Sequence, residues 1–198
     1  MKLKELEMTL QRVRPISSPR ADLEQYSTPA VIAADMLFTA FSLGDVEDKV
    51  VLDLGCGSGI LAIGAGLLGA REVIGLDADA AVLQQARENA IAIGVELELV
   101  HGSVESFEGR VDTVIMNPPF GAQNRNADRP FLEKAMGSAG VVYSLHMAST
   151  QEFLMMLVRS LGGEAAVQKR YKFEIPHMFA FHKKMKRDVE VVLLRIQT

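Results

Sequence analysis

Short apolar runs alternate with helical patterns along the whole chain. The apolar runs predict strands at 50–54, 72–76, 96–100, 112–116, 140–144, about 164–170 and 189–196. Segments with the period of amphipathic helices separate them, and strands joined by helical crossovers lie parallel in one sheet. Neither a linker nor an internal repeat interrupts the pattern, so we predict one doubly wound α/β domain over residues 1–198.

Capping residues indicate where two of the helices begin and end. Thr28 is expected to cap a helix whose first residue is Pro29. Asp79 is expected to cap a second helix, which stops at Gly94 because glycine readily takes the left-handed conformation that ends helices.

A third helix is predicted near the C-terminal end. Ser149 and Glu152 have the spacing of a capping box, and Gly162 closes the helix. Its apolar stripe is expected to lie in the core and consists of Phe153, Leu154, Leu157, Val158 and Leu161.

The tetrapeptide Asn117-Pro118-Pro119-Phe120 directly follows the fourth apolar run. Proline fixes φ near about −65° and holds the preceding residue extended, so Asn117 and Pro118 have little freedom. The Asn117 amide oxygen and the Pro118 carbonyl are then acceptors for a planar amino group, and Phe120 offers a stacking face. Prolines also simply end strands, which is the alternative interpretation.

A glycine-rich turn follows the first apolar run, with the sequence Asp53-Leu54-Gly55-Cys56-Gly57-Ser58-Gly59. Glycines allow positive φ and a close approach of the backbone to a ligand at a helix N-terminus. The dinucleotide fingerprint requires a glycine three residues after Gly57, where this chain has Ile60. Asp53 repels a pyrophosphate and attracts the ammonium of an amino acid, so the turn favours S-adenosylmethionine over NAD.

The second apolar run ends at Asp77. An acidic residue about 20 residues after the glycine turn binds ribose hydroxyls in doubly wound folds. Helix capping is the alternative role, but Asp79 is better placed for it, and Asp77 is therefore predicted to be free for a ligand.

These motifs resemble the class I S-adenosylmethionine-dependent methyltransferases, and the tetrapeptide resembles their amino-methylating branch. Further segments are similar to the methyltransferase-like five family, and they are Leu23 to Thr28, Val50 to Leu61, Asp112 to Gly121, Tyr143 to His146 and Phe181 to Lys184. The resemblance spans nearly the whole chain. It implies a Rossmann-like sheet of seven mostly parallel strands, the cofactor S-adenosyl-L-methionine, and methylation of adenine N6 in small-subunit ribosomal RNA.

The resemblance also implies the residues of the site. Residues 1–28 are expected to fold over the cofactor, with contacts from Gln25 and Thr28. The other cofactor contacts are expected at Asp53, Gly55, Gly57, Ser58, Ile60, Asp77, Ala78, Ser103, Val104 and Asn117. The catalytic residues are expected to be Asn117, Pro118, Pro119 and Phe120. A small zinc-binding activator subunit, with which the family's eukaryotic members act, is a candidate partner.

Ser103 departs from the family pattern, which usually has an acidic residue there to hold the adenine amino group of the cofactor. A serine hydroxyl accepts a weaker hydrogen bond than a carboxylate. We expect either a lower cofactor affinity or a substitution of this role by Glu105.

Positive charge gathers in the C-terminal part of the chain. Residues 169–195 contain eight Lys or Arg and three acidic residues, whereas the whole chain has a formal net charge of −4. Interleaved aromatics suit stacking on unpaired bases, so 169–188 is predicted to be a substrate-side segment that binds RNA. RNA contacts are expected at Phe181, His182, Lys183, Lys184, Lys186 and Arg187. A solvated loop with alternating core aromatics is the alternative.

The N-terminal segment carries a smaller basic cluster at Arg12, Arg14 and Arg20. Pro15 and Pro19 interrupt it, so we expect an irregular segment that becomes ordered when ligand or RNA binds.

Composition agrees with a cytoplasmic enzyme that needs no structural metal. A chain of 198 residues with 48% hydrophobic content can bury a core without disulfides. The single Cys56 cannot form an internal disulfide and is expected to pack beside the cofactor. The four histidines have no metal-ligand spacing, and no apolar stretch reaches the ~20 residues that span a membrane. The oligomeric state is left open.

Three other functions fit parts of the pattern. A protein glutamine N5-methyltransferase also methylates a planar amide nitrogen, but the basic segment favours RNA. A cofactor-binding subunit of an RNA-binding complex without catalysis would not need the intact tetrapeptide. An NAD-dependent oxidoreductase fails on the glycine spacing.

Overall fold

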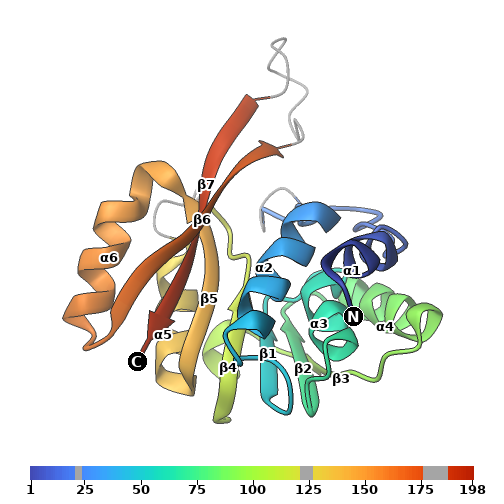
Figure 1. Cartoon of the computed structure of the whole chain (residues 1–198). Helices are drawn as coiled ribbons and strands as arrows, with labels where there is room; N and C mark the ends of the chain where they lie inside the picture. Colours follow the sequence, from blue (N-terminus) through green and yellow to red (C-terminus); the bar gives the residue numbers. More distant parts are fainter. Residues whose placement is uncertain (21–23, 121–126, 176–186) are drawn as a thin grey trace.

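The computed structural model describes residues 1–20, 24–120, 127–175 and 187–198, and in this part of the chain seven strands form one sheet (Figure 1). The strands are β1 (Val50–Leu54), β2 (Glu72–Asp77), β3 (Glu98–His101), β4 (Val111–Met116), β5 (Ala139–Met147), β6 (Glu164–Ile175) and β7 (Arg187–Gln197). Their order is β3-β2-β1-β4-β5-β7-β6. The first five are parallel, and β7 is antiparallel to both β5 and β6. The predicted doubly wound, mostly parallel sheet is confirmed.

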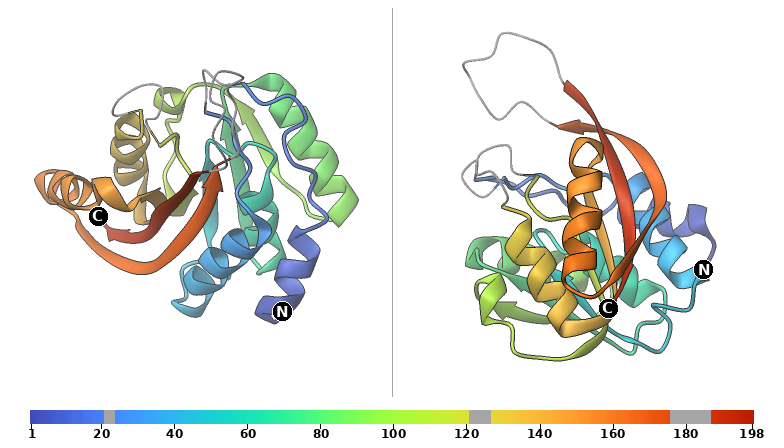
Figure 2. Two further views of the ribbon diagram at one scale, coloured as in Figure 1. Left: turned by 90° about the horizontal axis from the view of Figure 1, so that it is seen from above. Right: turned by 90° about the vertical axis from the view of Figure 1, so that its left-hand side faces the viewer.

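Helices cover both faces of the sheet (Figure 2). They are α1 (Leu3–Leu10), α2 (Ala30–Ser42), α3 (Ile60–Leu67), α4 (Ala80–Ile93), α5 (Arg129–Ser138) and α6 (Gln151–Ser160), with short 3-10 turns η2 (Val104–Ser106) and η3 (Ala148–Thr150). Side chains alternate along a strand, so Val51 packs with α1 to α3 while Leu52 packs with α5 and α6. No described helix is long and apolar enough to cross a membrane.

The predicted helix ends are correct in one case and shifted in the other. The Asp79 carboxylate accepts a hydrogen bond from the Ala81 backbone N–H, and Gly94 ends α4 with a φ of 82°. The prediction for Thr28 is wrong, because Pro29 occupies the N-cap position and α2 begins at Ala30. The Thr28 hydroxyl instead contacts a side chain at the sheet edge.

The capping box predicted for α6 is also wrong. Ser149 lies in η3, and Thr150 precedes the first helical residue without a side-chain cap bond. The stripe is only partly core, because Leu154 and Val158 are fully buried whereas Phe153 and Leu161 are each 44% exposed. α6 packs mainly on β6, which is the outermost strand of the described sheet. A single edge strand is too narrow to cover the whole apolar stripe of α6.

Strand boundaries differ from the prediction by a few residues. The third strand begins at Glu98 rather than 96, and β5, β6 and β7 are longer than expected. Long pairing between β6 and β7, over eleven residue pairs, extends both strands beyond the apolar runs. The sequence also gave no signal for α1.

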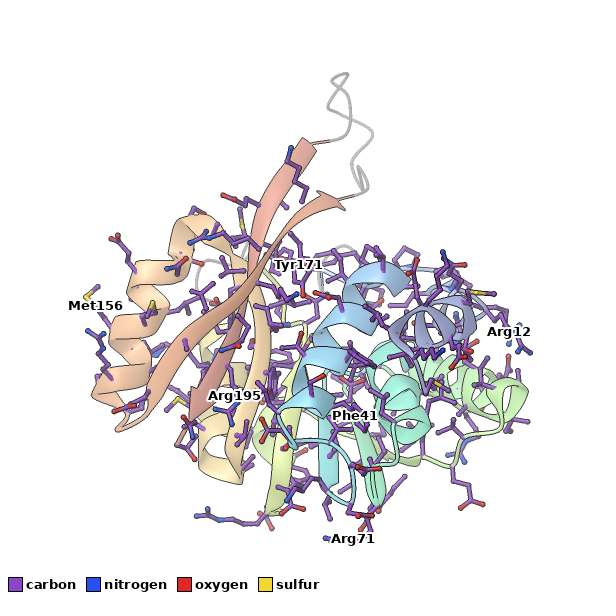
Figure 3. The ribbon with its side chains drawn as sticks, in the orientation of Figure 1. Arg12, Phe41, Arg71, Met156, Tyr171 and Arg195 are labelled. Carbon is purple, nitrogen blue, oxygen red and sulfur yellow. The ribbon has the colours of Figure 1, made fainter. Side chains whose placement is uncertain are left out.

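The topology places several functional segments at one edge of the sheet. The carboxyl ends of β1, β2 and β4 meet there, and β6 runs in the same direction as β5, so its last residues lie at that edge too (Figure 1). The Tyr171 hydroxyl on β6 donates to Asp35 on α2 at 2.8 Å (Figure 3). Lys169 on β6 also lies 3.5 Å from the Asp35 carboxylate, so these two contacts hold β6 against α2.

Candidate active site

Two adjoining cavities lie at the carboxyl edge of the sheet. The larger cavity has a volume of about 340 Å³ and the smaller cavity about 40 Å³. All the predicted cofactor contacts line one or both cavities, and they are Gln25, Thr28, Asp53, Gly55, Gly57, Ser58, Ile60, Asp77, Ala78, Ser103, Val104 and Asn117. Pro119 also lines the larger cavity, whereas Pro118 and Phe120 line neither.

The glycine turn forms the floor between the two cavities. Gly55, Gly57 and Gly59 have φ values of 78°, 54° and 83°, a left-handed conformation that favours glycine. A Cβ on Gly55 would lie 2.8 Å from the Phe131 ring, so this ring packs directly on the turn and leaves no room for a side chain at Gly55. The turn therefore lines both cavities with backbone that carries no side chain.

Asp53 is a buried carboxyl at the end of β1. One oxygen accepts a hydrogen bond from the Ala62 backbone N–H at 2.9 Å, and the other has no hydrogen-bond partner among the described residues. Burial raises the pKa of Asp53 to about 7, and the Asp77 charge adds to that rise. A buried acceptor without a partner costs free energy, which a cationic ligand would recover.

Asp77 is less free than predicted. Its two oxygens accept the backbone N–H groups of Gly57 at 2.9 Å and Asp79 at 3.0 Å. Burial nevertheless raises the pKa of this carboxyl. Each carboxylate oxygen can accept a second hydrogen bond, so Asp77 both holds the glycine turn and presents acceptors to the larger cavity.

Asn117 lies at the junction of both cavities. Its amide nitrogen donates to the Thr28 hydroxyl at 2.9 Å, which fixes the carboxamide orientation. Its amide oxygen is buried and has no hydrogen-bond partner in the described part of the chain. The arrangement leaves an oriented acceptor beside Asp53 and Asp77.

Phe120 is buried rather than presented to the cavity. The residue is 7% exposed, and its ring centroid lies 5.2 Å from that of Tyr26, with the two rings tilted by 39°. The Phe120 backbone N–H donates to the Tyr26 hydroxyl at 3.0 Å. Burial, followed by the nearby Glu24 charge, raises the pKa of Tyr26, which keeps this hydroxyl neutral. Stacking of Phe120 on a base therefore stays a prediction.

The N-terminal segment 14–17 is held onto α4 by side-chain hydrogen bonds. Asn89 accepts from the Arg14 N–H at 3.1 Å and donates to the carbonyls of Arg14 and Ser58 at 3.0 and 2.9 Å. Gln85 binds the Pro15 carbonyl and the Ser17 N–H. The segment is irregular, as predicted, but these contacts already position it.

Two further residues connect this segment to the site. Ile16 lines both cavities, and the Gln25 amide donates to Asp79 at 3.1 Å while accepting from the Arg20 N–H at 2.8 Å. The Gln25 side-chain amide thus hydrogen-bonds within the protein through both its nitrogen and its oxygen, and Gln25 also lines the larger cavity.

Ser103 and Glu105 lie together at the far wall of the larger cavity. The Glu105 backbone N–H and the Ser103 hydroxyl lower the pKa of the Glu105 carboxyl. An ionised carboxylate therefore lies beside Ser103 in the larger cavity.

Cys56 is buried in the glycine turn. Burial and the charges of Asp53 and Asp77 raise the pKa of its thiol. A neutral thiol is a poor nucleophile, which fits the predicted packing role. No described group of three or more His, Cys, Asp or Glu has the arrangement of metal ligands.

Phe131 was missed from the sequence, together with Ile16, Tyr26 and Asn89. Phe131 lies in the first turn of α5, and its ring packs directly on Gly55 and lines the larger cavity. Only Tyr26 had a signal, since it belongs to the L-E-Q-Y segment. The others come from elements distant in sequence, and no local pattern distinguishes them from core residues.

Most of the predicted RNA contacts lie outside the described residues. These are Phe181, His182, Lys183, Lys184 and Lys186, while only the backbone of Arg187 is described, at the start of β7. Lys169, Arg170 and Lys172 are exposed on β6, in the part of the basic segment that the structure describes.

Comparison with known proteins agrees with this geometry. Residues 34–118 match the family described as Ribosomal protein L11 methyltransferase (PrmA). The rRNA N(6)-adenosine-methyltransferase METTL5 of Danio rerio is 38% identical to this chain, over 98% of each protein. The chain belongs to the METTL5 family. Mettl5 of Drosophila melanogaster is 36% identical, over 100% of this chain and 97% of that protein.

A solved structure supports the same assignment. A candidate RNA methyltransferase from Pyrococcus horikoshii has a TM-score of 0.93 and 40% identity, covering 100% of this chain and 98% of that chain. The predicted resemblance and the class I fold are therefore confirmed. Membership of the METTL5 family does not favour the glutamine N5-methyltransferase alternative.

Proposed function

We propose that this member of the METTL5 family transfers a methyl group from S-adenosyl-L-methionine to N6 of adenosine in ribosomal RNA. The observation that carries the proposal is the Asn117 amide oxygen, which is buried, oriented through Thr28, and without a hydrogen-bond partner among the described residues. An acceptor in this state suits an amino group that brings its own hydrogens.

Asn117 and Pro118 prepare the amine for reaction. The lone pair of an adenine amino group is delocalised into the ring, which makes the nitrogen a poor nucleophile. Hydrogen bonds from the two amino hydrogens to the Asn117 amide oxygen and the Pro118 carbonyl draw the nitrogen toward tetrahedral geometry. Pro118 and Pro119 restrict this lip, so the acceptors are positioned before the substrate arrives. The predicted stacking of Phe120 on the base would require its ring, which packs on Tyr26 away from both cavities, to turn toward the substrate.

The cavity residues fit S-adenosylmethionine. The Asp53 oxygen without a partner suits the cofactor ammonium, Asp77 the ribose hydroxyls, and Glu105 with Ser103 the adenine amino group. Gly55 and Gly57 line both cavities with backbone that carries no side chain. When bound, the cofactor supplies an electrophilic methyl group on a sulfonium.

RNA is proposed to approach over the substrate-side segment 169–188. Support comes from the exposed Lys169, Arg170 and Lys172 on β6, whose end lies at the same sheet edge as Asn117. Basic side chains bind phosphates without sequence preference, and the target base must leave its stack to enter the site. Residues 1–28 are proposed to cover the cofactor.

A small zinc-binding activator subunit remains a proposed partner. Within the described residues β3 and β6 are the outer strands of the sheet, and an edge strand offers unpaired backbone groups to which a partner can add a strand. Size-exclusion chromatography with and without such a subunit tests this, and two independent peaks would contradict it. Cytoplasmic location is likewise a proposal.

The test of the main proposal uses Asn117→Ala. Protein and cofactor are incubated with ribosomal RNA, and the digested RNA is analysed for N6-methyladenosine by mass spectrometry. We expect transfer to fall by about 100-fold or more, because an oriented polar contact in the transition state is lost. S-adenosylmethionine binding, measured by calorimetry, should be largely retained.

Gln84→Ala is the matched control, because it removes an exposed carboxamide from the outer face of α4. It should leave transfer unchanged. Full activity of Asn117→Ala, or methylation of release factor in preference to RNA, would overturn the proposal. Equal loss of binding and transfer would show that Asn117 is structural.

A further inference from the structure

Three buried polar side chains form a continuous hydrogen-bonded chain behind the larger cavity. The Ser144 hydroxyl lies 2.7 Å from His146 Nε2, and His146 Nδ1 lies 3.2 Å from an Asp128 carboxylate oxygen. Ser144 and His146 are on β5, and Asp128 immediately precedes α5. Their exposed fractions are 0%, 1% and 9%.

The Ser144, His146 and Asp128 side chains are the residue types of a hydrolase catalytic triad, but this serine is not accessible to a substrate. Ser144 lies inside the sheet, paired with Met116 on β4 and Leu194 on β7. None of the three residues lines either cavity. A nucleophile must reach its substrate, so Ser144 cannot act as one here, and the chain needs another explanation.

Asp128 links the chain to the cavity wall. Its neighbours Ala127, Pro130 and Phe131 line the larger cavity, and the Phe131 ring faces Gly55 of the glycine turn. Asp128 occupies the N-cap position of α5, but its side chain makes no capping hydrogen bond and turns to His146 instead. The first turn of α5 is thereby fastened to β5.

The electrostatic surroundings of Asp128 explain why its contact with His146 matters for the position of the cavity wall. The Asp128 charge also contributes to raising the pKa of Tyr26, after burial and Glu24, so the carboxylate lies near the covering N-terminal segment. A buried carboxylate without a donor is costly, and loss of the imidazole would remove the contact at 3.2 Å between Asp128 and His146. The contact with His146 therefore stabilises the wall in one position.

We propose that His146 is a positioning residue for cofactor binding. Nδ1 carries a hydrogen and donates it to Asp128, while Nε2 lies 2.7 Å from the Ser144 hydroxyl. The opposite tautomer would direct a lone pair at the carboxylate, which is repulsive. Through Asp128 the ring holds residues 127–131 in place, with the Phe131 ring packed on Gly55, and the shape of the larger cavity depends on that placement.

A pair of substitutions separates this role from simple core packing. In His146→Asn the amide nitrogen reaches as far as Nδ1, so the Asp128 contact is kept and the Ser144 contact is lost. In His146→Gln the amide reaches the position of Nε2, so the Ser144 contact is kept and the Asp128 contact is lost. Both variants remove the ring.

The readout is S-adenosylmethionine binding by calorimetry, together with the KM for cofactor and kcat. We expect His146→Asn to bind within about threefold of the wild type and His146→Gln to bind about tenfold more weakly, as for a lost hydrogen bond to a charged group. The KM for cofactor should rise more than kcat falls. Equal binding by the two variants, whether weakened or unchanged, would overturn the proposal.

A measurement on the wild-type protein tests the proposal even if the two variants do not fold. Nitrogen-15 NMR of labelled histidine distinguishes a protonated Nδ1 from a protonated Nε2. We expect the Nδ1–H form for His146, and the Nε2–H form would refute the arrangement. The inference rests on the proposed function only for the identity of the ligand. Cofactor binding without RNA methylation would contradict the proposed function and leave this inference standing.

Discussion

Asp53→Asn tests whether Asp53, whose buried charge destabilises the folded protein, is needed to bind the cofactor. Asp53 is 1% exposed, one oxygen has no hydrogen-bond partner among the described residues, and burial raises its pKa to about 7. Asparagine keeps the shape and one acceptor for the Ala62 N–H, but it has no charge to bury.

The size of the effect follows from the pKa. One pKa unit corresponds to about 1.4 kcal/mol, so the rise from 3.8 to about 7 corresponds to a destabilisation of about 4 kcal/mol once the carboxyl is ionised. The folded-state pKa lies above the unfolded one, so the folded state binds more protons. Stability is therefore lost as the pH rises from about 4 to above 7.

The assay is urea unfolding of both proteins at pH 5 and pH 8 without added cofactor. The difference between the two proteins reports the ionisation of Asp53 together with its coupling to Asp77, because all other titrating groups are present in both. We expect the free energy of unfolding of the wild type to fall by about 2 to 3 kcal/mol relative to Asp53→Asn between these pH values. S-adenosylmethionine should bind the variant at least about tenfold more weakly, since the ammonium loses a charged partner.

Parallel pH profiles for the two proteins would refute the reasoning about burial. Unchanged cofactor binding with the expected pH profile would show that Asp53 is a buried charge without a role in binding. The two results are independent, so each part of the argument is tested.

Two further substitutions test the glycine turn and the N-terminal segment. Gly55→Ala combines a φ of 78° with a Cβ 2.8 Å from Phe131, whereas the control Gly44→Ala has a φ of 77° and nothing within 4 Å. Gly44→Ala should lower the free energy of unfolding by about 1 to 2 kcal/mol, and Gly55→Ala by more because of the collision with Phe131. Only Gly55→Ala should weaken cofactor binding in calorimetry; equal binding would exclude a role of the turn in cofactor binding. Asn89→Ala removes three hydrogen bonds to Arg14 and Ser58 and should cost about 1 to 3 kcal/mol while speeding tryptic cleavage after Arg12. Cleavage as slow as in the control Gln84→Ala would show that α4 does not hold the segment.

Local sequence was enough for the elements whose signal is carried by neighbouring residues. Alternation of apolar runs with helical periods gave all seven strands, and Asp79 and Gly94 gave the ends of α4, because caps depend on a few adjacent residues. Predictions failed where tertiary contacts compete with a local signal. Thr28 is an example, since its hydroxyl contacts Asn117, 89 residues away, instead of capping α2.

The candidate site shows the same division. The glycine turn and the tetrapeptide are contiguous motifs, so the sequence by itself determined the family and the cofactor class. Only the tertiary structure decided that the Asn117 oxygen has no hydrogen-bond partner among the described residues, that Phe120 packs on Tyr26, and that a histidine on β5 contacts Asp128 at the start of α5. The physical reason is that burial and hydrogen-bond satisfaction depend on which distant segments meet, and no short stretch of sequence records that.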